Sequence, residues 1–296
     1  MNVNELLGSE LCGSLRTNGY AIIDGLFGSN FTKGLRKEIK FLHQTEILKP
    51  NTTRLFTHDK KMISVPKKNI FEIDITRHNS DLAPNYVKVL SEDSTISDTF
   101  NKRMRNVEIL KTAIKVQYNE GKGGSFSMHS DSDVKQDDRV ISGVLYLNPD
   151  WKRGDGGELK LYPYPQDPVV IEPVMDRLVL FSSPHMVHRV LPAYQERYCL
   201  TFWFYGFNDD YVEIKKPTEP NLRFLLQPRN KKHLVKLHYG QEWMRSIIES
   251  HHDSETRAEL VSALNSDLGK LRGYFHDYSD WIPKTKLLRS EDQPWI

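Results

Sequence analysis

Between residues 113 and 205 the chain alternates short apolar runs with turn-forming residues, and this rhythm is its strongest constraint on the fold. Eight runs of three to eight residues are rich in Val, Ile, Leu, Phe and Tyr, and Gly, Pro, Asp and Asn stand between them. Short strands at this spacing predict an antiparallel sandwich or barrel. The runs are 113–118, 125–129, 140–147, 158–161, 169–171, 178–181, 185–191 and 198–205.

Helical patterns flank this strand-rich region on both sides. Apolar residues recur at helical spacing over residues 3–17 and 30–43, and residues 84–105 also favour a helix, one that faces the surface. On the C-terminal side, residues 230–275 predict two or three polar helices. The fold class is therefore predicted to be mainly β with flanking helices.

Near residue 210 the sequence pattern changes from short apolar runs to a polar linker followed by helical patterns. We expect residues 1–210 to form one domain, in which the N-terminal helices support the β core. Residues 211–296 are expected to form a helical C-terminal extension that begins with a linker over 215–220. This extension either packs on the β core, which we favour, or serves dimer or partner contacts.

The segment before the strand-rich region is harder to assign. Short strands are predicted at 20–24 and 69–75, whereas the polar segment 46–68 is interpreted as a long loop with one short strand. The loop is either a mobile lid over the mouth of the barrel or an ordinary variable loop. Its basic residues are Arg54, Lys60, Lys61, Lys67 and Lys68.

Composition excludes several classes of protein. Lys and Arg number 41 against 39 Asp and Glu, so a net charge of +2 gives no direct signal for nucleic acid. The two cysteines, Cys12 and Cys199, do not make a disulfide scaffold. No secretory signal and no apolar window long enough for a membrane span is seen. We therefore expect a soluble protein in the cytoplasm or nucleus.

Three side chains in the strand-rich region are candidate metal ligands. His129 and Asp131 lie two residues apart, so on a strand they would point to the same face. With His188 from a distant strand they would form the two-histidine, one-carboxylate set of non-haem Fe(II) oxygenases. Structural zinc would instead favour nearby cysteines. Asp133 is a rival to Asp131, and the His-x-Asp pair alone also fits a hydrogen bond at the end of a strand.

Arg197 is the second chemical signal. It follows His188 by nine residues and begins a strand after a turn predicted at 191–193. A guanidinium that faces into an apolar barrel is costly to bury unless an anion pairs with it. A dicarboxylate cosubstrate is one such partner, because a carboxylate accepts two parallel hydrogen bonds from arginine. A salt bridge to Glu158 or another acid of the barrel is the alternative.

Other histidines and tryptophans are assigned structural roles. His185 stands three residues before His188, so we expect it on the surface. His251 and His252 have no supporting acid or thiol and are interpreted as a solvated helix face. Trp151 and Trp203 are expected in the core.

Together these motifs resemble the 2-oxoglutarate and Fe(II)-dependent dioxygenases, and more closely the prolyl 4-hydroxylase branch, which includes the hypoxia-type prolyl hydroxylases. The resemblance extends from about residue 16 to residue 207. It rests on His-x-Asp, on a Gly-Gly strand and on an arginine nine residues after the second histidine. Its strongest stretches are Tyr118 with the following Gly-rich turn, His129-x-Asp131, 144–148, Trp151, 156–159 and 188–203.

The resemblance implies roles for particular residues. His129, Asp131 and His188 would bind iron as the catalytic centre, and Arg197 would bind the far carboxylate of 2-oxoglutarate. Three further residues would bind the cosubstrate or line its pocket. Tyr146 would hydrogen-bond the same carboxylate, Tyr118 would form a pocket wall at a spacing one residue longer than the family pattern, and Thr201 either lines the pocket or is a core residue.

The resemblance also implies a fold, cofactors and a reaction. The fold would be a double-stranded β-helix, or jelly-roll barrel. The cofactors would be Fe(II), 2-oxoglutarate as cosubstrate and O2, with ascorbate as a candidate reductant. The reaction would hydroxylate a prolyl residue of a protein or peptide and release succinate and CO2. The alternatives are the same chemistry on another side chain or a small molecule, or a non-catalytic iron and 2-oxoglutarate sensor.

Overall fold

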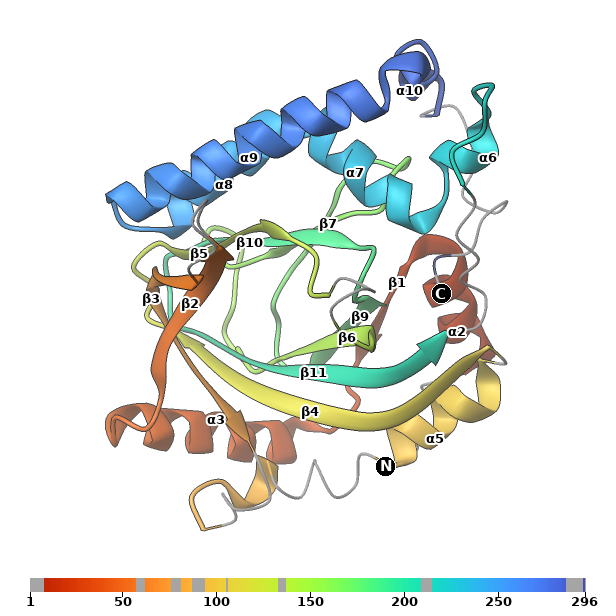
Figure 1. Cartoon of the computed structure of the whole chain (residues 1–296). Coiled ribbons are helices and arrows are strands. Elements are labelled where there is room, and N and C mark those ends of the chain that lie inside the picture. Colours follow the sequence, from red (N-terminus) through yellow and green to blue (C-terminus); the bar gives the residue numbers. More distant parts are fainter. Residues whose placement is uncertain are drawn as a thin grey trace.

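Two antiparallel sheets form the centre of the molecule (Figure 1). Among the residues that the structure describes, the larger sheet has seven strands in the order β1-β9-β6-β11-β4-β3-β2, and the smaller has four in the order β5-β10-β7-β8. The strands are β1 (Tyr20–Asp24), β2 (Lys49–Phe56), β3 (Met62–Ile75), β4 (Val107–Asn119), β5 (Gly124–His129), β6 (Arg139–Tyr146), β7 (Leu159–Tyr162), β8 (Val169–Ile171), β9 (Arg177–Ser182), β10 (Val187–Ala193) and β11 (Arg197–Asn208).

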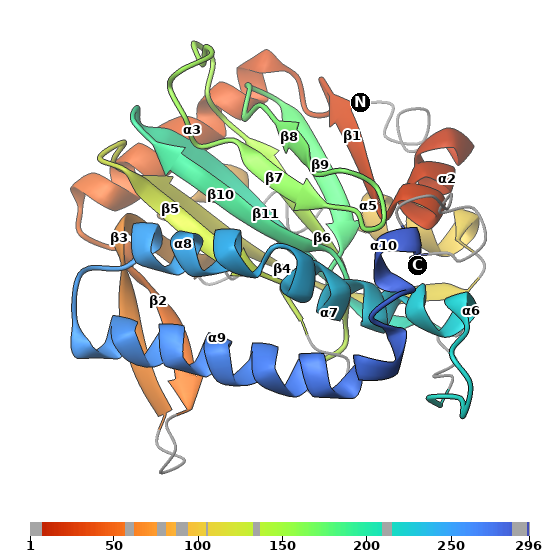
Figure 2. The same cartoon turned by 90° about the horizontal axis from the view of Figure 1, so that it is seen from above.

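Helices cover both sides of this β core. The helices are α2 (Ser9–Asn18), α3 (Ser29–Gln44), α5 (Ser94–Arg103), α6 (Leu222–Leu225), α7 (Pro228–His238), α8 (Gly240–Ser250), α9 (Glu255–Tyr274), the 3-10 turn η2 (His276–Tyr278) and α10 (Ile282–Thr285). Helices α3 and α5 lie along β4, and α7, α8 and α9 lie on the opposite side of the molecule (Figures 1 and 2). There α8 contacts β5 and β10, and α9 packs against α7 and α8. The computed structural model describes residues 8–56, 62–75, 81–86, 94–104, 106–132, 137–208, 215–285 and 295.

The eight runs between residues 113 and 205 all form strands, as their pattern predicts. Strand β6 lies inside the larger sheet between β9 and β11, and almost every one of its residues is buried. A strand covered on both faces has a continuous apolar run instead of strict alternation, which explains why this segment was easy to assign. The turn expected at 191–193 is corrected, because these residues belong to β10 and the chain turns after Ala193.

The segment 46–68 differs most from expectation. It is not a loop with one short strand, because β2 and β3 pair as an antiparallel hairpin at the edge of the larger sheet. The inward side chains Asn51 and Lys67 are polar and line a cavity, so the apolar alternation that would have revealed the strands is missing. The lid was predicted for the whole segment 46–68, of which residues 57–61 lie outside the described residues.

The N-terminal helices agree with the sequence patterns in part. Helix α3 confirms the helix predicted at 30–43, and it buries Thr32, Leu35, Ile39 and Leu42 along one face. Helix α2 occupies the later part of the predicted 3–17 segment, and residues 3–7 lie outside the described residues. In the segment 84–105, predicted to be helical, residues 84–86 and helix α5 are helical, and residues 87–93 and 105 lie outside the described part of the chain. Contrary to expectation, α5 is not purely surface-facing, because Phe100 is fully buried.

The C-terminal region contains the expected polar helices, and they pack on the β core. Phe224 and Leu234 share a buried apolar cluster with Met128 of β5 and Val187 of β10. Helix α9 begins at the N-cap Ser254, whose hydroxyl accepts a hydrogen bond from the Arg257 backbone N–H. No helix in the described part of the chain has the length and apolarity needed to cross a bilayer.

Candidate metal and anion site

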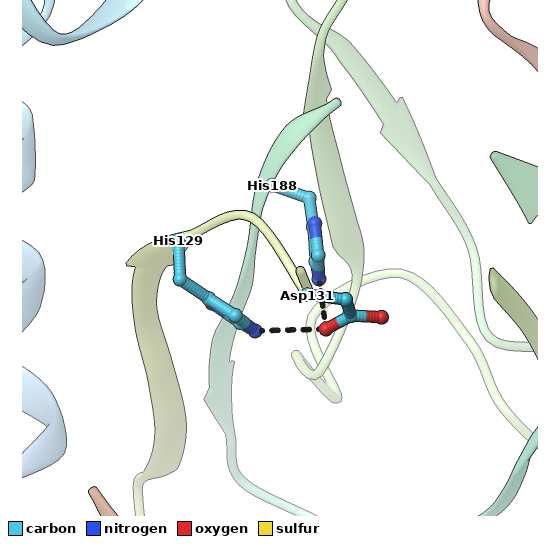
Figure 3. A group of neighbouring side chains, drawn as sticks. All are labelled: His129, Asp131 and His188. Atoms are coloured by element: carbon cyan, nitrogen blue, oxygen red, sulfur yellow. Dashed lines mark ion pairs between the residues drawn. The ribbon is translucent and has the colours of Figure 1, made fainter. Parts of the chain in front are cut away.

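His129, Asp131 and His188 come together between the two sheets. His129 ends β5, and His188 lies opposite it on the neighbouring strand β10. Asp131 follows the end of β5, so it reaches the histidines from a loop and not from the strand on which the sequence argument placed it. Its Oδ1 atom lies 3.4 Å from Nε2 of His129 and 3.6 Å from Nε2 of His188 (Figure 3).

Hydrogen bonds fix the orientation of all three side chains. Nδ1 of His129 donates to the Ser127 carbonyl at 2.8 Å, and Nδ1 of His188 donates to the Met186 carbonyl at 3.1 Å. A carbonyl oxygen only accepts, so each Nδ1 carries a proton, and in the neutral form of the ring this leaves Nε2 with a free lone pair.

The second oxygen of the carboxylate is held as well. Oδ2 of Asp131 accepts hydrogen bonds from the Ser142 hydroxyl at 2.6 Å and from the Trp203 indole N–H at 3.2 Å. Oδ1 is therefore the oxygen that remains turned toward the two histidines.

The protonation states suit a divalent cation. Burial, and after it the positive charge of a protonated His129, lower the pKa of His188 to about 4, against the opposing effects of Asp131 and the Met186 carbonyl. Burial alone would raise the pKa of Asp131, but His188, His129 and the Ser142 hydroxyl lower it overall. At neutral pH the cluster thus offers a neutral imidazole from His188 and an ionised carboxylate, which are the forms that bind metals.

A cavity of about 170 Å³ connects this cluster to Arg197. The three candidate ligands line one end of the cavity, and Arg197 and Thr201 line it on strand β11. Thr201 is thus placed in the cavity wall. Asp133, the rival ligand, lies outside the described residues.

Arg197 is buried without an acidic partner among the described residues. Only 4% of its surface is exposed, and its Nε donates to the Gly157 carbonyl at 2.8 Å. Its Nη1 contacts the Cys199 thiol at 3.1 Å, and no ion pair with Glu158, the alternative partner, is found. Gly157 has φ of 78°, and a Cβ there would lie 2.7 Å from Cδ of Arg197. The absence of a side chain at Gly157 therefore leaves the space that the Arg197 side chain occupies.

Tyr146 accompanies this arginine. Its side chain is fully buried, and Cζ of Arg197 lies 5.0 Å from the centre of its ring. Its hydroxyl has no hydrogen-bond partner of normal geometry among the described residues. Burial raises the pKa of Tyr146, so the hydroxyl stays a neutral donor. A buried donor without an acceptor, next to a guanidinium without a carboxylate, fits a carboxylate ligand.

The structure does not bring Tyr118 into this cavity. Its hydroxyl donates to Glu196 at 2.8 Å, and its ring packs against His43, with the ring centres 4.2 Å apart. Lys115 and Gln117 of the same strand line the cavity, and residue 118 therefore points to the opposite face. The expectation that Tyr118 forms a pocket wall is corrected.

Sequence reasoning missed Trp203 and a polar wall. Trp203 lines the cavity and donates to Asp131, so it is not simply a core residue. The wall opposite the metal cluster is a hydrogen-bonded chain. Lys67 donates to Asn51 at 2.7 Å, Asn51 donates to Glu72, and Lys115 pairs with Glu72 at 2.8 Å. The alternation of Lys115, Gln117 and their apolar neighbours on β4 was the available signal.

Two histidines and a tryptophan outside the cavity also differ from expectation. His185 is buried, not on the surface, with Nδ1 3.4 Å from the Ser182 hydroxyl. His251 is fully buried, and its Nε2 lies 3.0 Å from the Thr53 hydroxyl of β2. Trp151 is half-buried, and its indole N–H donates to the Gly156 carbonyl at 2.8 Å.

Comparison with known proteins gives a consistent result. Residues 114–205 match the family model described as the 2OG-Fe(II) oxygenase superfamily. A hypoxia-inducible factor prolyl hydroxylase of Caenorhabditis elegans is 28% identical over 196 residues, which are 64% of this chain and 27% of that protein. The chain spans only 24 to 41% of the length of the curated relatives it resembles.

Solved structures extend the similarity beyond the β core. A prolyl 4-hydroxylase from Phytophthora capsici has a TM-score of 0.76 and 27% identity, and the match covers 97% of this chain and 94% of that one. A prolyl hydroxylase from Trichoplax adhaerens, solved with a hypoxia inducible factor peptide, has a TM-score of 0.59 and 28% identity over 69% of this chain and 90% of that one. Residues 114–205 therefore resemble the 2OG-Fe(II) oxygenase superfamily, and the chain is similar to prolyl hydroxylases.

Proposed function

We propose that this protein is an Fe(II)- and 2-oxoglutarate-dependent hydroxylase that acts on a prolyl residue of a protein or peptide and releases succinate and CO2. One observation carries the proposal. A single cavity joins two histidines and a carboxylate to a buried arginine that has no acidic partner among the described residues.

The donor set fits Fe(II). One ligand atom from each of His129, Asp131 and His188 lies within 4.8 Å of the others, and the donors are the nitrogens and the oxygen that this ion accepts. We assign these three side chains as its ligands. When bound, Fe(II) would supply the redox chemistry that couples decarboxylation of 2-oxoglutarate to activation of O2. Ascorbate as a reductant stays a prediction.

The protein's own residues would hold the cosubstrate. Arg197 would bind its far carboxylate through the guanidinium, and Tyr146 would donate its hydroxyl to the same group. Thr201 would contact the ligand from the cavity wall. The small cavity would keep most water away from the reacting groups, which strengthens each of these charge interactions.

The polar wall would face the substrate. It combines strands β2, β3 and β4, and Lys67, Glu72 and Lys115 give it charges of both signs. The relatives named above are prolyl hydroxylases, and one was solved with a peptide, so a prolyl residue in a peptide is the favoured target. Within the predicted lid 46–68, the described residues form part of this wall.

Three further assignments belong to the same proposal. We interpret the two facing sheets as a double-stranded β-helix, or jelly roll. Residues 1–210 would form the oxygenase domain, and 211–296 would form a helical extension to it. A cytoplasmic or nuclear location stays a prediction from the sequence.

Succinate release tests the proposal. The purified protein is incubated with Fe(II), 2-oxoglutarate, O2 and a library of proline-containing peptides, and products are examined by mass spectrometry for the gain of one oxygen atom. We expect hydroxylated proline from the wild-type protein and none from Asp131→Ala or His188→Ala. Turnover at the wild-type rate by both variants would exclude the proposed centre.

The two alternative functions, hydroxylation of a different target and non-catalytic sensing, would give different results in the same incubation. Hydroxylation at another residue, or of a small molecule, would keep the chemistry and change the substrate. A non-catalytic sensor would bind Fe(II) and 2-oxoglutarate anaerobically, with a visible charge-transfer band, but would release no succinate with any peptide.

A further inference from the structure

Helix α8 of the C-terminal extension lies along the strands that carry both candidate histidine ligands (Figure 2). Strand β5 is the edge of the smaller sheet and pairs there only with β10. The N–H groups on its outer edge therefore need partners from elsewhere. One of them, the N–H of Met128, donates to the Ser246 hydroxyl of α8 at 2.9 Å, and both residues are buried.

This hydrogen bond acts on the peptide group that orients His129. The N–H of Met128 and the carbonyl of Ser127 belong to one planar peptide. That carbonyl accepts the Nδ1 proton of His129 at 2.8 Å. The Ser246 hydroxyl in turn donates to the Trp243 carbonyl within α8, at 2.6 Å. A continuous chain of hydrogen bonds therefore runs from the helix, through one peptide, to the imidazole.

A second contact holds the other histidine strand. Arg189 directly follows His188, and only 3% of its surface is exposed. Its guanidinium bonds Glu249 at 2.5 Å and lies 3.9 Å from Glu242. Residues 242, 246 and 249 recur at helical spacing, so one face of α8 contacts both strands.

We propose that α8 is a positioning element of the metal centre and that Ser246 fixes the ring of His129 through the Ser127–Met128 peptide. The inference rests on the proposed metal site. Its physical basis is that partners of the second imidazole nitrogen set the tautomer and direction of a histidine ligand. Polarisation along a hydrogen-bond chain strengthens each member of the chain.

A matched pair of variants tests this role. Ser246→Ala removes the hydroxyl that holds the peptide. Ser250→Ala removes an equally buried hydroxyl one turn later on α8, which bonds the Ser246 carbonyl at 2.7 Å and has no contact with the peptide of a ligand. Both variants lose a buried serine hydroxyl, and only one acts on His129.

Metal binding and the histidine tautomer are the two readouts. The metal-free full chain is titrated with Mn(II) without O2, and we expect Ser246→Ala to bind about 10-fold more weakly while Ser250→Ala stays within about 2-fold of wild type. In the metal-free protein, the ring nitrogen shifts of His129 should reveal a mixture of tautomers in Ser246→Ala only.

The outcomes separate this inference from the proposed function. If Ser246→Ala binds Mn(II) as tightly as wild type, the inference is overturned and the metal site stands. If the wild-type protein binds no Mn(II), both are overturned. Should Ser246→Ala fail to fold, Glu249→Gln tests the second contact, with about 3-fold weaker Mn(II) binding expected and unchanged binding counting against the inference.

Discussion

At one end of the cavity two imidazole nitrogens and a carboxylate oxygen face one another, whereas at the other a buried guanidinium has no carboxylate partner in the described chain. The first arrangement needs a cation and the second needs an anion. Each end is electrostatically incomplete, and the two share one small cavity. A metal ion chelated by a dicarboxylate would complete both ends.

The two ends also differ in how they are held. The histidines and Asp131 are each oriented by a hydrogen bond at the atom that does not face the cluster. Arg197 is held by a carbonyl and a thiol, and Tyr146 has an unused hydroxyl. The end of the cavity with the histidines and Asp131 (the metal end) is thus preorganised before a metal binds. The end with Arg197 and Tyr146 (the arginine end) has hydrogen-bond donors that are still available for a ligand. The two ends should therefore respond separately to mutation.

The largest effect is expected at Asp131. Asp131→Ala removes the only carboxylate of the cluster, and we expect Mn(II) affinity to fall by at least about 100-fold, because second-sphere changes alone cost about 10- to 100-fold. Calorimetric titration of the metal-free protein measures this loss. Asp74→Ala, which removes a largely exposed carboxylate of β3, is the control and should bind as wild type. Retained affinity in Asp131→Ala would show that another residue supplies the ligand.

Arg197 should show the opposite selectivity. Arg197→Met removes the buried charge, and truncating one partner of a buried, hydrogen-bonded charge pair costs about 2–5 kcal/mol. We therefore expect 2-oxoglutarate to bind at least about 30-fold more weakly to the Mn(II)-loaded variant. The affinity for Mn(II), measured without 2-oxoglutarate, should change little. A parallel loss of metal affinity would contradict the view that the two ends are independent.

Tyr146 offers a finer test of the arginine end. Its hydroxyl donates to no acceptor among the described residues, so Tyr146→Phe should leave the free energy of unfolding unchanged or slightly higher. A hydrogen bond to a charged group contributes about 1.5–3 kcal/mol. The Tyr146→Phe variant should therefore bind 2-oxoglutarate at least about 10-fold more weakly than the wild-type protein. Urea unfolding and isothermal titration separate the two quantities. A large loss of stability would mean that the hydroxyl already has an internal partner.

The success of sequence reasoning depended on whether a strand's inward side chains were apolar. Strand β6 is buried on both faces and was predicted correctly. The strand predicted at 69–75 is the last part of β3, but the rest of the β2–β3 hairpin was missed because Asn51 and Lys67 face the cavity and interrupt the apolar alternation.

Side-chain direction was the second limit on what the sequence could predict. Tyr118 and Trp203 both lie on well-predicted strands, but Tyr118 points away from the cavity that it was expected to line, and Trp203, expected in the core, lines that cavity. A strand's existence follows from composition, whereas the face of each side chain depends on the position of one bulge or strand end. The ligand cluster was anticipated because its spacing is a family motif, although Asp131 reaches it from a loop. The buried His251 gave no sequence signal at all.

The smallest expected effect concerns protons at the metal end. His188 has a pKa of about 4 because of burial, whereas an unfolded histidine has a pKa near 6.5. Below about pH 6.5, His188 therefore binds a proton in the unfolded chain but stays neutral in the folded chain. The free energy of unfolding falls as the pH drops toward 4. The slope is at most about 1.4 kcal/mol per pH unit for each such histidine.

His251 provides the comparison within the same chain, because burial also lowers its pKa to about 4 although it lies outside the cavity. His188→Gln and His251→Gln should each flatten the pH dependence of metal-free unfolding between pH 7 and pH 5, as measured in urea. Saturating Mn(II) should steepen the loss of stability on acidification in His251→Gln but not in His188→Gln, since protons compete with the metal only at its ligands. An equal response of both variants to Mn(II) would place the proton-sensitive metal contact outside His188.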